Sequence, residues 1–274
     1  MQRTAPLVDI GINLAHPEYD ADRSLVLARA AAAGVVHLVV TGSSIASSQA
    51  AAGFARASPE RLSATAGIHP HHASELGPPE RAELARLLAL PEIAAAGECG
   101  LDFYRDLSPR VDQERAFRCQ IELAIAAGKP LFLHQRDAHG DFVRILKDYG
   151  GSLPRAVAHC FTGSAAECAE YLALGLAIGI TGWICDERRG LHLREVVRSI
   201  PAGRLLLETD GPYLLPRTLK PKPRTRRNEP MYLPEVCAAT AHARGEDPEL
   251  TARASSEAAA AFFGFALPAD AQST

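Results

Sequence analysis

Eight short apolar runs recur along this chain, separated by longer stretches of helical composition, and this alternation constrains the fold more than any other feature. The runs are rich in Val, Ile and Leu. They are continuously apolar rather than alternating, as expected for strands buried on both faces of a parallel sheet. They span residues 7–14, 35–42, 62–69, 93–100, 130–137, 156–163, 176–183 and 204–211.

The stretches between the runs carry helix signals, several of them ending at a glycine, the residue that commonly follows a helix C-terminus. We expect helices at 22–33, 112–127, 164–174, 230–243 and 247–263. Strict alternation of eight strands with helices predicts an α/β fold, a TIM (β/α)₈ barrel, as a single domain over residues 1–274. An open doubly wound sheet is the alternative, but no Gly-rich phosphate-binding turn follows the first run.

Composition limits the function classes. With a formal net charge of −3, the chain is not basic overall, so any nucleic-acid contact must come from a local patch. Its six cysteines form no CxxC pair, which is typical of reduced thiols. No signal peptide is evident at the start, and the longest apolar stretch, residues 172–185, is too short to span a bilayer. We expect a cytoplasmic monomer without membrane association.

Five side chains with metal-binding chemistry stand at the ends of five of the apolar runs. Each one alone is the kind of residue that caps a strand or makes hydrogen bonds at a rim. Together they favour a functional site, because the C-terminal ends of barrel strands form the active-site face. The five are His69, Glu98, His134, His159 and Asp210.

Imidazole and carboxylate groups together suit Zn²⁺, Mn²⁺ or another divalent cation. A metal held by Glu98, His134 and His159 leaves positions open for water and substrate. Such an ion lowers the pKa of its water and polarises a phosphoryl oxygen. Asp210 is then a candidate to take the proton of that water or to bind the metal itself.

A basic segment, residues 212–227, follows directly after Asp210. It has six basic residues, no acidic one, and prolines that disfavour a helix. One interpretation is a flexible solvated loop. The other, which we favour, is an extended contact to a phosphate backbone, through Arg224, Arg226 and Arg227.

Four further side chains are candidates for substrate contact. Arg136 and Thr162 come just after His134 and His159 and could touch phosphate. Tyr104 and Trp183 are candidates for base stacking, although packing at the rim is an equally good interpretation of both.

Five segments resemble, in the same order along the chain, the signature segments of the TatD family of metal-dependent deoxyribonucleases. They are GIHPH (67–71), GECGLDFYRD (97–106), FLHQRDA (132–138), HCFTG (159–163) and ETDGPYLLPR (208–217). Within that family the chain is most similar to the TatD-like branch, through DIGINL (9–14), GITGWICDERRG (179–190) and KPKPRTRRNEP (220–230).

The resemblance implies a TIM barrel that uses divalent metal to hydrolyse DNA from the 3′ end. It implies that Glu98, His134 and His159 are metal ligands, that Asp210 is the catalytic or ligating carboxylate, and that His69 lies beside them in the catalytic group. We expect Mg²⁺ to support activity, with Zn²⁺ or Mn²⁺ as alternatives. The expected substrate is single-stranded DNA or 3′ ends, with RNA as an alternative.

The chain departs from most of the wider family at strand one. The family has an HxH pair there that binds a second metal, whereas this chain has Gly11 and Asn13, as in the TatD-like branch. Glycine has no side chain to ligate, and Asn is a weak ligand for a transition metal. We therefore expect one tightly bound ion.

Two other functions stay open from the sequence. The same metal chemistry serves the hydrolysis of another ester or amide, such as deacylation of an aminoacyl-tRNA, and the basic segment is compatible with that substrate. A non-catalytic nucleic-acid-binding protein is the second alternative, against which the intact set of metal-ligating side chains argues.

Overall fold

The structure, a computed structural model, describes residues 5–268. Its strands form an eight-stranded sheet in chain order, and each pairing resolved residue by residue is parallel. This order, with helices in between, confirms the predicted (β/α)₈ class and differs from a doubly wound sheet, in which the order reverses. The strands are β1 (Leu7–Ile12), β2 (Val35–Val40), β3 (Leu62–Ala66), β4 (Ile93–Asp102), β5 (Leu131–Arg136), β6 (Ala156–Ala158), β7 (Ala177–Ile180) and β8 (Leu205–Leu207).

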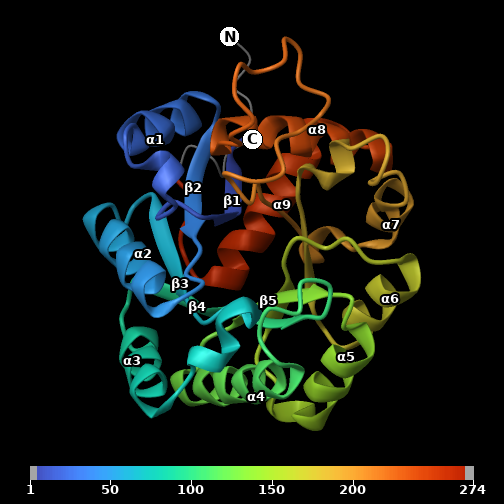
Figure 1. Cartoon of the computed structure of the whole chain (residues 1–274). Helices are drawn as coiled ribbons and strands as arrows, with labels where there is room; N and C mark the ends of the chain where they lie inside the picture. The colour runs from blue at the N-terminus through green and yellow to red at the C-terminus, as the bar shows by residue number, and fades with distance from the viewer. Residues whose placement is uncertain (1–4, 269–274) are drawn as a thin grey trace. The chain divides into compact units, whose positions relative to one another are not determined.

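All five predicted helices are present, within three residues of the expected bounds. Among residues 5–268, no helix has both the length and the apolarity needed to traverse a lipid bilayer. The helices are α1 (Arg23–Ala32), α2 (Ile45–Ala57), α3 (Pro78–Leu88), α4 (Arg110–Ala127), α5 (His139–Asp148), α6 (Ala165–Ala173), α7 (Leu193–Ser199), α8 (Leu233–Arg244) and α9 (Pro248–Phe263) (Figure 1).

The chain divides into two compact units. Unit 1 comprises residues up to 39, 160–172 and those from 177 onward, and unit 2 comprises residues 40–159 and 173–176. The prediction of one domain stays a prediction, and residues 1–4 and 269–274, which it included, lie outside the described residues.

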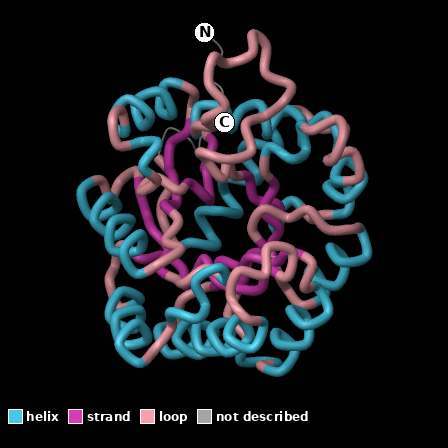
Figure 2. The backbone as a smooth tube through the Cα atoms, viewed as in Figure 1, coloured by secondary structure: helices cyan, strands magenta, loops and turns pink. Residues whose placement is uncertain are grey.

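In unit 2, helices lie along the strands that carry the site. Helix α2 packs on β3 and α4 packs on β4, so that each helix covers one side of its strand (Figures 1 and 2). Strand β4 pairs with both β3 and β5, and nine of its ten residues are buried. This burial on both faces accounts for the continuously apolar runs in the sequence.

In unit 1, α9 packs on β1 and β8, and α8 packs on α9. The last residue of β1, Ile12, is joined by a parallel bridge to Gly211, in the segment after β8. The fully buried carboxylate of Asp9 supports this join, because its Oδ1 accepts a hydrogen bond of 2.9 Å from the backbone N–H of Thr209. Burial raises the pKa of Asp9 to about 7.

The predicted strand boundaries were wrong in detail. The runs that contain His69, His159 and Asp210 stop being strand before those residues, whereas β4 extends beyond Glu98 to Asp102. The chain turns out of the extended conformation where Cys160 and Asp210 have φ angles of 47° and 54°. Apolar composition continues past the strand ends because the turns also bury apolar side chains, such as Ile68 and Phe161.

Two glycines in β4 permit the close approach of β4 to β5. Gly97 and Gly100 have φ angles of +137° and +144°, and a Cβ atom on either would collide with a backbone carbonyl oxygen of β5, that of Phe132 or of His134. Only glycine tolerates both the positive φ angle and the lack of space for a Cβ atom. Their spacing places Glu98 between them, on the strand next to His134.

Candidate metal centre

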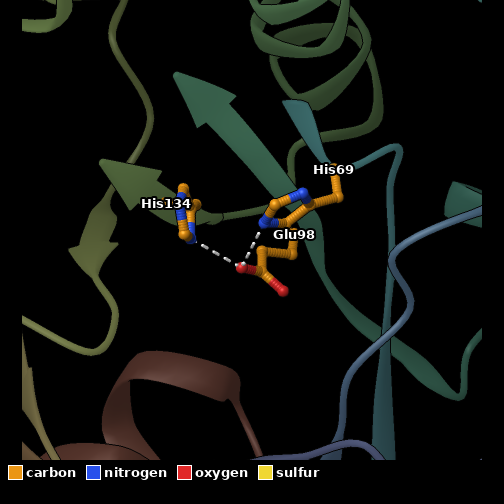
Figure 3. A group of neighbouring side chains, drawn as sticks. All are labelled: His69, Glu98 and His134. Carbon is orange, nitrogen blue, oxygen red and sulfur yellow. Dashed lines mark hydrogen bonds and ion pairs between the residues drawn. The ribbon is translucent and has the colours of Figure 1, made fainter. Parts of the chain in front are cut away.

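Three imidazoles of unit 2 converge on one carboxylate oxygen. Glu98, in the middle of β4 and 6% exposed, has its Oε1 atom 3.3 Å from His69 Nε2, 3.0 Å from His134 Nδ1 and 3.2 Å from His159 Nε2. Figure 3 shows one ring nitrogen of His69 and one of His134 on either side of the same Glu98 oxygen. We call Glu98 and these three histidines the imidazole cluster; its members come from β4, β5 and the turns after β3 and β6.

The hydrogen bonds of His69 define its tautomer. Its Nδ1 atom accepts the backbone N–H of His71 at 3.1 Å, so Nδ1 carries no hydrogen. Burial lowers the pKa of His69 to about 4, which keeps the ring neutral at pH 7. The hydrogen therefore sits on Nε2, where it is donated to Glu98.

His134 presents its other ring nitrogen, Nδ1, to Glu98. Its Nε2 atom lies 3.3 Å from Asp102 Oδ2, and because an ionised carboxylate only accepts, Nε2 carries a hydrogen. In the neutral ring, the lone pair of Nδ1 then faces the Glu98 oxygen, another lone-pair atom, at 3.0 Å. Burial alone would lower the pKa of His134, but the hydrogen bonds to Asp102 and Glu98 raise it, because both contacts favour the protonated ring.

The cluster has the chemistry of a cation site. Burial alone would raise the pKa of Glu98, yet the surrounding imidazoles hold it well below its usual value, so the carboxylate is ionised. The candidate donor atoms of His69, Glu98 and His134 all lie within 4.8 Å of one another. Proximity thus groups His69, rather than His159, with Glu98 and His134, and the Nε2 atom of His159 contacts the same Glu98 oxygen at 3.2 Å.

Asp102 and His71 belong to the site but did not emerge from the sequence. Asp102 is 1% exposed, and besides His134 its carboxylate accepts from His71 Nε2 at 2.8 Å and from the N–H of Arg105 at 2.8 Å. Burial would raise the pKa of Asp102, but these donors lower it. The signal was the spacing of Glu98 and Asp102, four residues apart on one strand and hence on the same face.

Asp210 and Thr162 lie in unit 1. Asp210 follows β8, and its Oδ1 atom accepts a hydrogen bond of 3.1 Å from the side-chain amide of Asn13. Its own N–H donates to the carbonyl of Gly11 at 2.8 Å, so the two positions without the HxH histidines hold this carboxylate in place. Thr162 is exposed, and its carbonyl accepts from His192 Nε2 at 3.0 Å.

The basic segment is a loop closed at its base. The N–H of Asn228 donates to the carbonyl of Pro212 at 2.9 Å, and the buried hydroxyl of Tyr19 donates to the carbonyl of Asn228 at 2.6 Å. Arg224 and Arg226 are exposed on this loop.

Arg227, in contrast, is engaged within the protein. Its guanidinium pairs with Asp22 at 2.8 Å and with Glu229 at 2.6 Å, and Arg29 pairs with the same two carboxylates. Of the three arginines predicted to contact phosphate, Arg224 and Arg226 are therefore the two that remain available.

The two aromatic candidates differ in exposure. Tyr104 is exposed, in the loop after β4, with the guanidinium of Arg136 stacked 3.8 Å from its ring centroid. Trp183 is half-buried in the turn after β7, and the guanidinium of Arg189 lies 5.9 Å from its ring centroid.

The (β/α)₈ topology and a buried His–Glu cluster together define a barrel hydrolase with donors for a cation. Comparison with known proteins identifies the family of hydrolases: a profile of the TatD related DNase family matches residues 8–264. The chain belongs to this family, and it is a hydrolase of the nuclease class, as the sequence motifs indicated.

Individual relatives agree. The chain is 50% identical to the 3′-5′ ssDNA/RNA exonuclease TatD of Erwinia billingiae, with 90% of this chain and 95% of that protein covered. It is 49% identical to the protein of the same name from Cronobacter sakazakii, covering 96% and 100%. The crystal structure of YJJV, a TatD homologue from Escherichia coli K12, superposes with a TM-score of 0.86 at 27% identity, covering 96% and 98%.

Proposed function

We propose that the chain is a divalent-metal-dependent 3′–5′ exonuclease that acts on single-stranded DNA, with RNA as a second substrate. The observation that carries this proposal is the imidazole cluster, in which three imidazoles converge on Glu98 Oε1, with His134 Nδ1 at 3.0 Å. The polarity of the cleavage and the single-stranded substrate come from the names of the relatives.

Glu98, His134 and His159 would hold the ion. Two imidazoles and one carboxylate favour Mn²⁺ or Zn²⁺ as the tightly bound ion. Mg²⁺ prefers oxygen ligands and is proposed to bind more weakly, together with substrate phosphate. A divalent ion held there would supply Lewis acidity toward a phosphoryl oxygen.

The neighbouring side chains have separate tasks in this proposal. Asp102 keeps the hydrogen of His134 on Nε2 and thereby keeps Nδ1 free for the ion. His69 donates its Nε2 hydrogen to Glu98 and so orients that carboxylate, and its place in the catalytic group rests on the family resemblance. For Asp210, the role of proton acceptor rests on the family resemblance, and Asn13 holds this carboxylate through its amide.

Phosphate contacts outside the cluster are proposed for three exposed arginines and one exposed threonine. Arg136 and Thr162 follow the cluster histidines along the chain, and Arg224 and Arg226 stand on the closed basic loop. Contacts of this kind recognise charge rather than base sequence.

The test is product analysis of 5′-labelled single-stranded DNA incubated with a panel of divalent cations. A ladder that shortens from the 3′ end, in the presence of metal only, is the expected result. Glu98→Ala, His134→Ala and His159→Ala should each lower the rate at least 100-fold, because ligands act as a unit. His72→Ala removes an exposed imidazole from the turn that carries His69 and is the matched control.

Hydrolysis of an aminoacyl-tRNA ester without any shortening of the DNA would overturn the nuclease proposal in favour of another ester hydrolase. Near-native DNA hydrolysis by any of the three ligand variants at micromolar metal would overturn the assignment of the ligands.

A further inference from the structure

An exposed aromatic ring with a cation stacked on it stands at the ends of β4 and β5. Tyr104, 58% exposed, lies two residues beyond Asp102, and the Cζ atom of Arg136 lies 3.8 Å from its ring centroid. Arg136 is itself exposed and is the last residue of β5. One face of the tyrosine ring is thus covered by a guanidinium, and the exposure of the side chain leaves the other face to solvent.

Internal stability does not account for this pair. Over residues 5–268, no carboxylate forms an ion pair with Arg136, and the hydroxyl of Tyr104 has no hydrogen-bond partner. A second stack in the same loop has a structural explanation. Arg110 lies 4.3 Å from the ring centroid of Phe103, but it also pairs with Asp106 at 3.4 Å, and Phe103 is half-buried.

The pair is held in position by the strands that carry the metal centre. Asp102 and Arg136 are register partners on β4 and β5, and the N–H of Phe103 donates to the carbonyl of Arg136 at 2.9 Å. Arg136 lies two residues beyond His134, about 7 Å along the strand, and on the same face of it. The ring and the guanidinium are therefore placed before any substrate binds.

We propose that Tyr104, backed by Arg136, is a nucleobase-stacking subsite beside the imidazole cluster. The free face of the ring stacks one unpaired base of the substrate, and the guanidinium contacts a phosphate of the same strand. Stacking tolerates every base, because each base has a π-face, and it requires a base that has left the helical stack. The inference rests on the proposed nuclease function and names the part of the substrate that is recognised.

Fluorescence of a single-stranded oligonucleotide with 2-aminopurine at its 3′ end tests this subsite. The oligonucleotide carries phosphorothioate linkages that resist hydrolysis, and it is titrated with the full chain in the presence of Mn²⁺. Stacking on Tyr104 quenches the fluorescence. Tyr104→Ala should abolish the quenching and weaken binding roughly 5- to 150-fold, the range measured for loss of one stacked base.

Three matched variants separate stacking from other effects. Tyr104→Trp should retain the quenching, whereas Tyr104→Leu, which is apolar but not aromatic, should behave like Tyr104→Ala. Arg110→Ala removes the cation of the second stack and should leave binding unchanged. An oligonucleotide with abasic 3′-terminal sites should bind wild type and Tyr104→Ala alike.

Quenching and affinity that survive Tyr104→Ala, or full binding by Tyr104→Leu, would overturn the subsite. Equal Tyr104-dependent binding of a blunt duplex would also overturn it, because paired bases would then suffice. These outcomes are distinct from failure of the nuclease proposal, which would appear as wild-type protein that does not shorten unmodified DNA with any metal.

Discussion

Replacement of Asp102 by Asn should weaken metal binding without removing a ligand. Asp102 is the buried acceptor that two imidazoles share, with His134 Nε2 at 3.3 Å and His71 Nε2 at 2.8 Å from the same Oδ2 atom. Asn has nearly the same shape but one acceptor oxygen and an NH₂ group that only donates. The NH₂ group then faces either the two imidazole N–H groups or the N–H of Arg105, which donates to the other oxygen of Asp102 at 2.8 Å. In both orientations a donor meets a donor, and a neutral amide holds the hydrogen of His134 on Nε2 less strongly than a carboxylate does.

The size of the effect follows from these contacts. Removal of the hydrogen-bond partner of a ligating histidine typically costs 10- to 100-fold in metal affinity. That range corresponds to about 1.4–2.7 kcal/mol of binding free energy. Asp102→Ala should cost more, because both of these half-buried imidazole N–H groups are then left without their acceptor.

Competition of the protein with a chromophoric chelator for Mn²⁺ or Zn²⁺ measures this affinity directly. Nitrogen-15 spectra of the metal-free protein add a second observable, because they report which ring nitrogen of His134 carries the hydrogen. Asp106→Asn is the matched control, since Asp106 is an exposed carboxylate of the same loop that pairs with Arg110. A metal affinity for Asp102→Asn within twofold of wild type, in a folded protein, would refute the positioning role.

Four further predictions concern the basic segment, its arginine pairs, Asp9 and the number of metal sites. Arg224→Ala together with Arg226→Ala should flatten the salt dependence of single-stranded DNA binding by about 1.4 in log–log slope, about 0.7 for each lost phosphate contact. Arg227→Ala should instead lower the free energy of unfolding by about 1 kcal/mol, because the half-buried Asp22 and the buried Glu229 each lose one of two arginine partners and keep only Arg29. The folded-state pKa of Asp9 is about 7, above its unfolded value, so the folded state holds the extra proton. Asp9 therefore lowers the free energy of unfolding by up to about 1.4 kcal/mol per pH unit as pH rises from about 4 to 7. Denaturant titrations at several pH values measure this loss, and Asp9→Asn should not show it. Calorimetric titration of the substrate-free protein should show one tight divalent site, at the imidazole cluster, and two sites of comparable affinity would contradict this.

The sequence was sufficient for the fold class because the relevant signal is local. Continuous apolar runs follow from burial on both faces of a parallel sheet, and helix ends follow from glycines, so strands and helices emerged in the right order. Strand ends were less well predicted, since apolar composition continues into buried turns such as that of His159. Whether a residue is still strand there depends on pairing with a neighbouring strand.

The site was only partly predictable for a related reason. Glu98 and the three histidines stand out by residue type, but which nitrogen carries a hydrogen depends on partners such as Asp102 and the backbone of His71. Arg227 looked like the other cations of its segment. Its partner Asp22 lies 205 residues earlier in the chain, and no local pattern indicates such a pairing.

The closed base of the loop between Pro212 and Asn228 has a consequence for protein engineering. Because a backbone hydrogen bond joins its two ends, the tip can be lengthened at little entropic cost, about 0.6 kcal/mol for each doubling of its length. Exposed tips of this kind are also where new chain termini are best tolerated. A circular permutant that opens at Thr225 would keep both ends of the loop anchored to the rest of unit 1, one through Pro212 and the other through Tyr19 and Asp22.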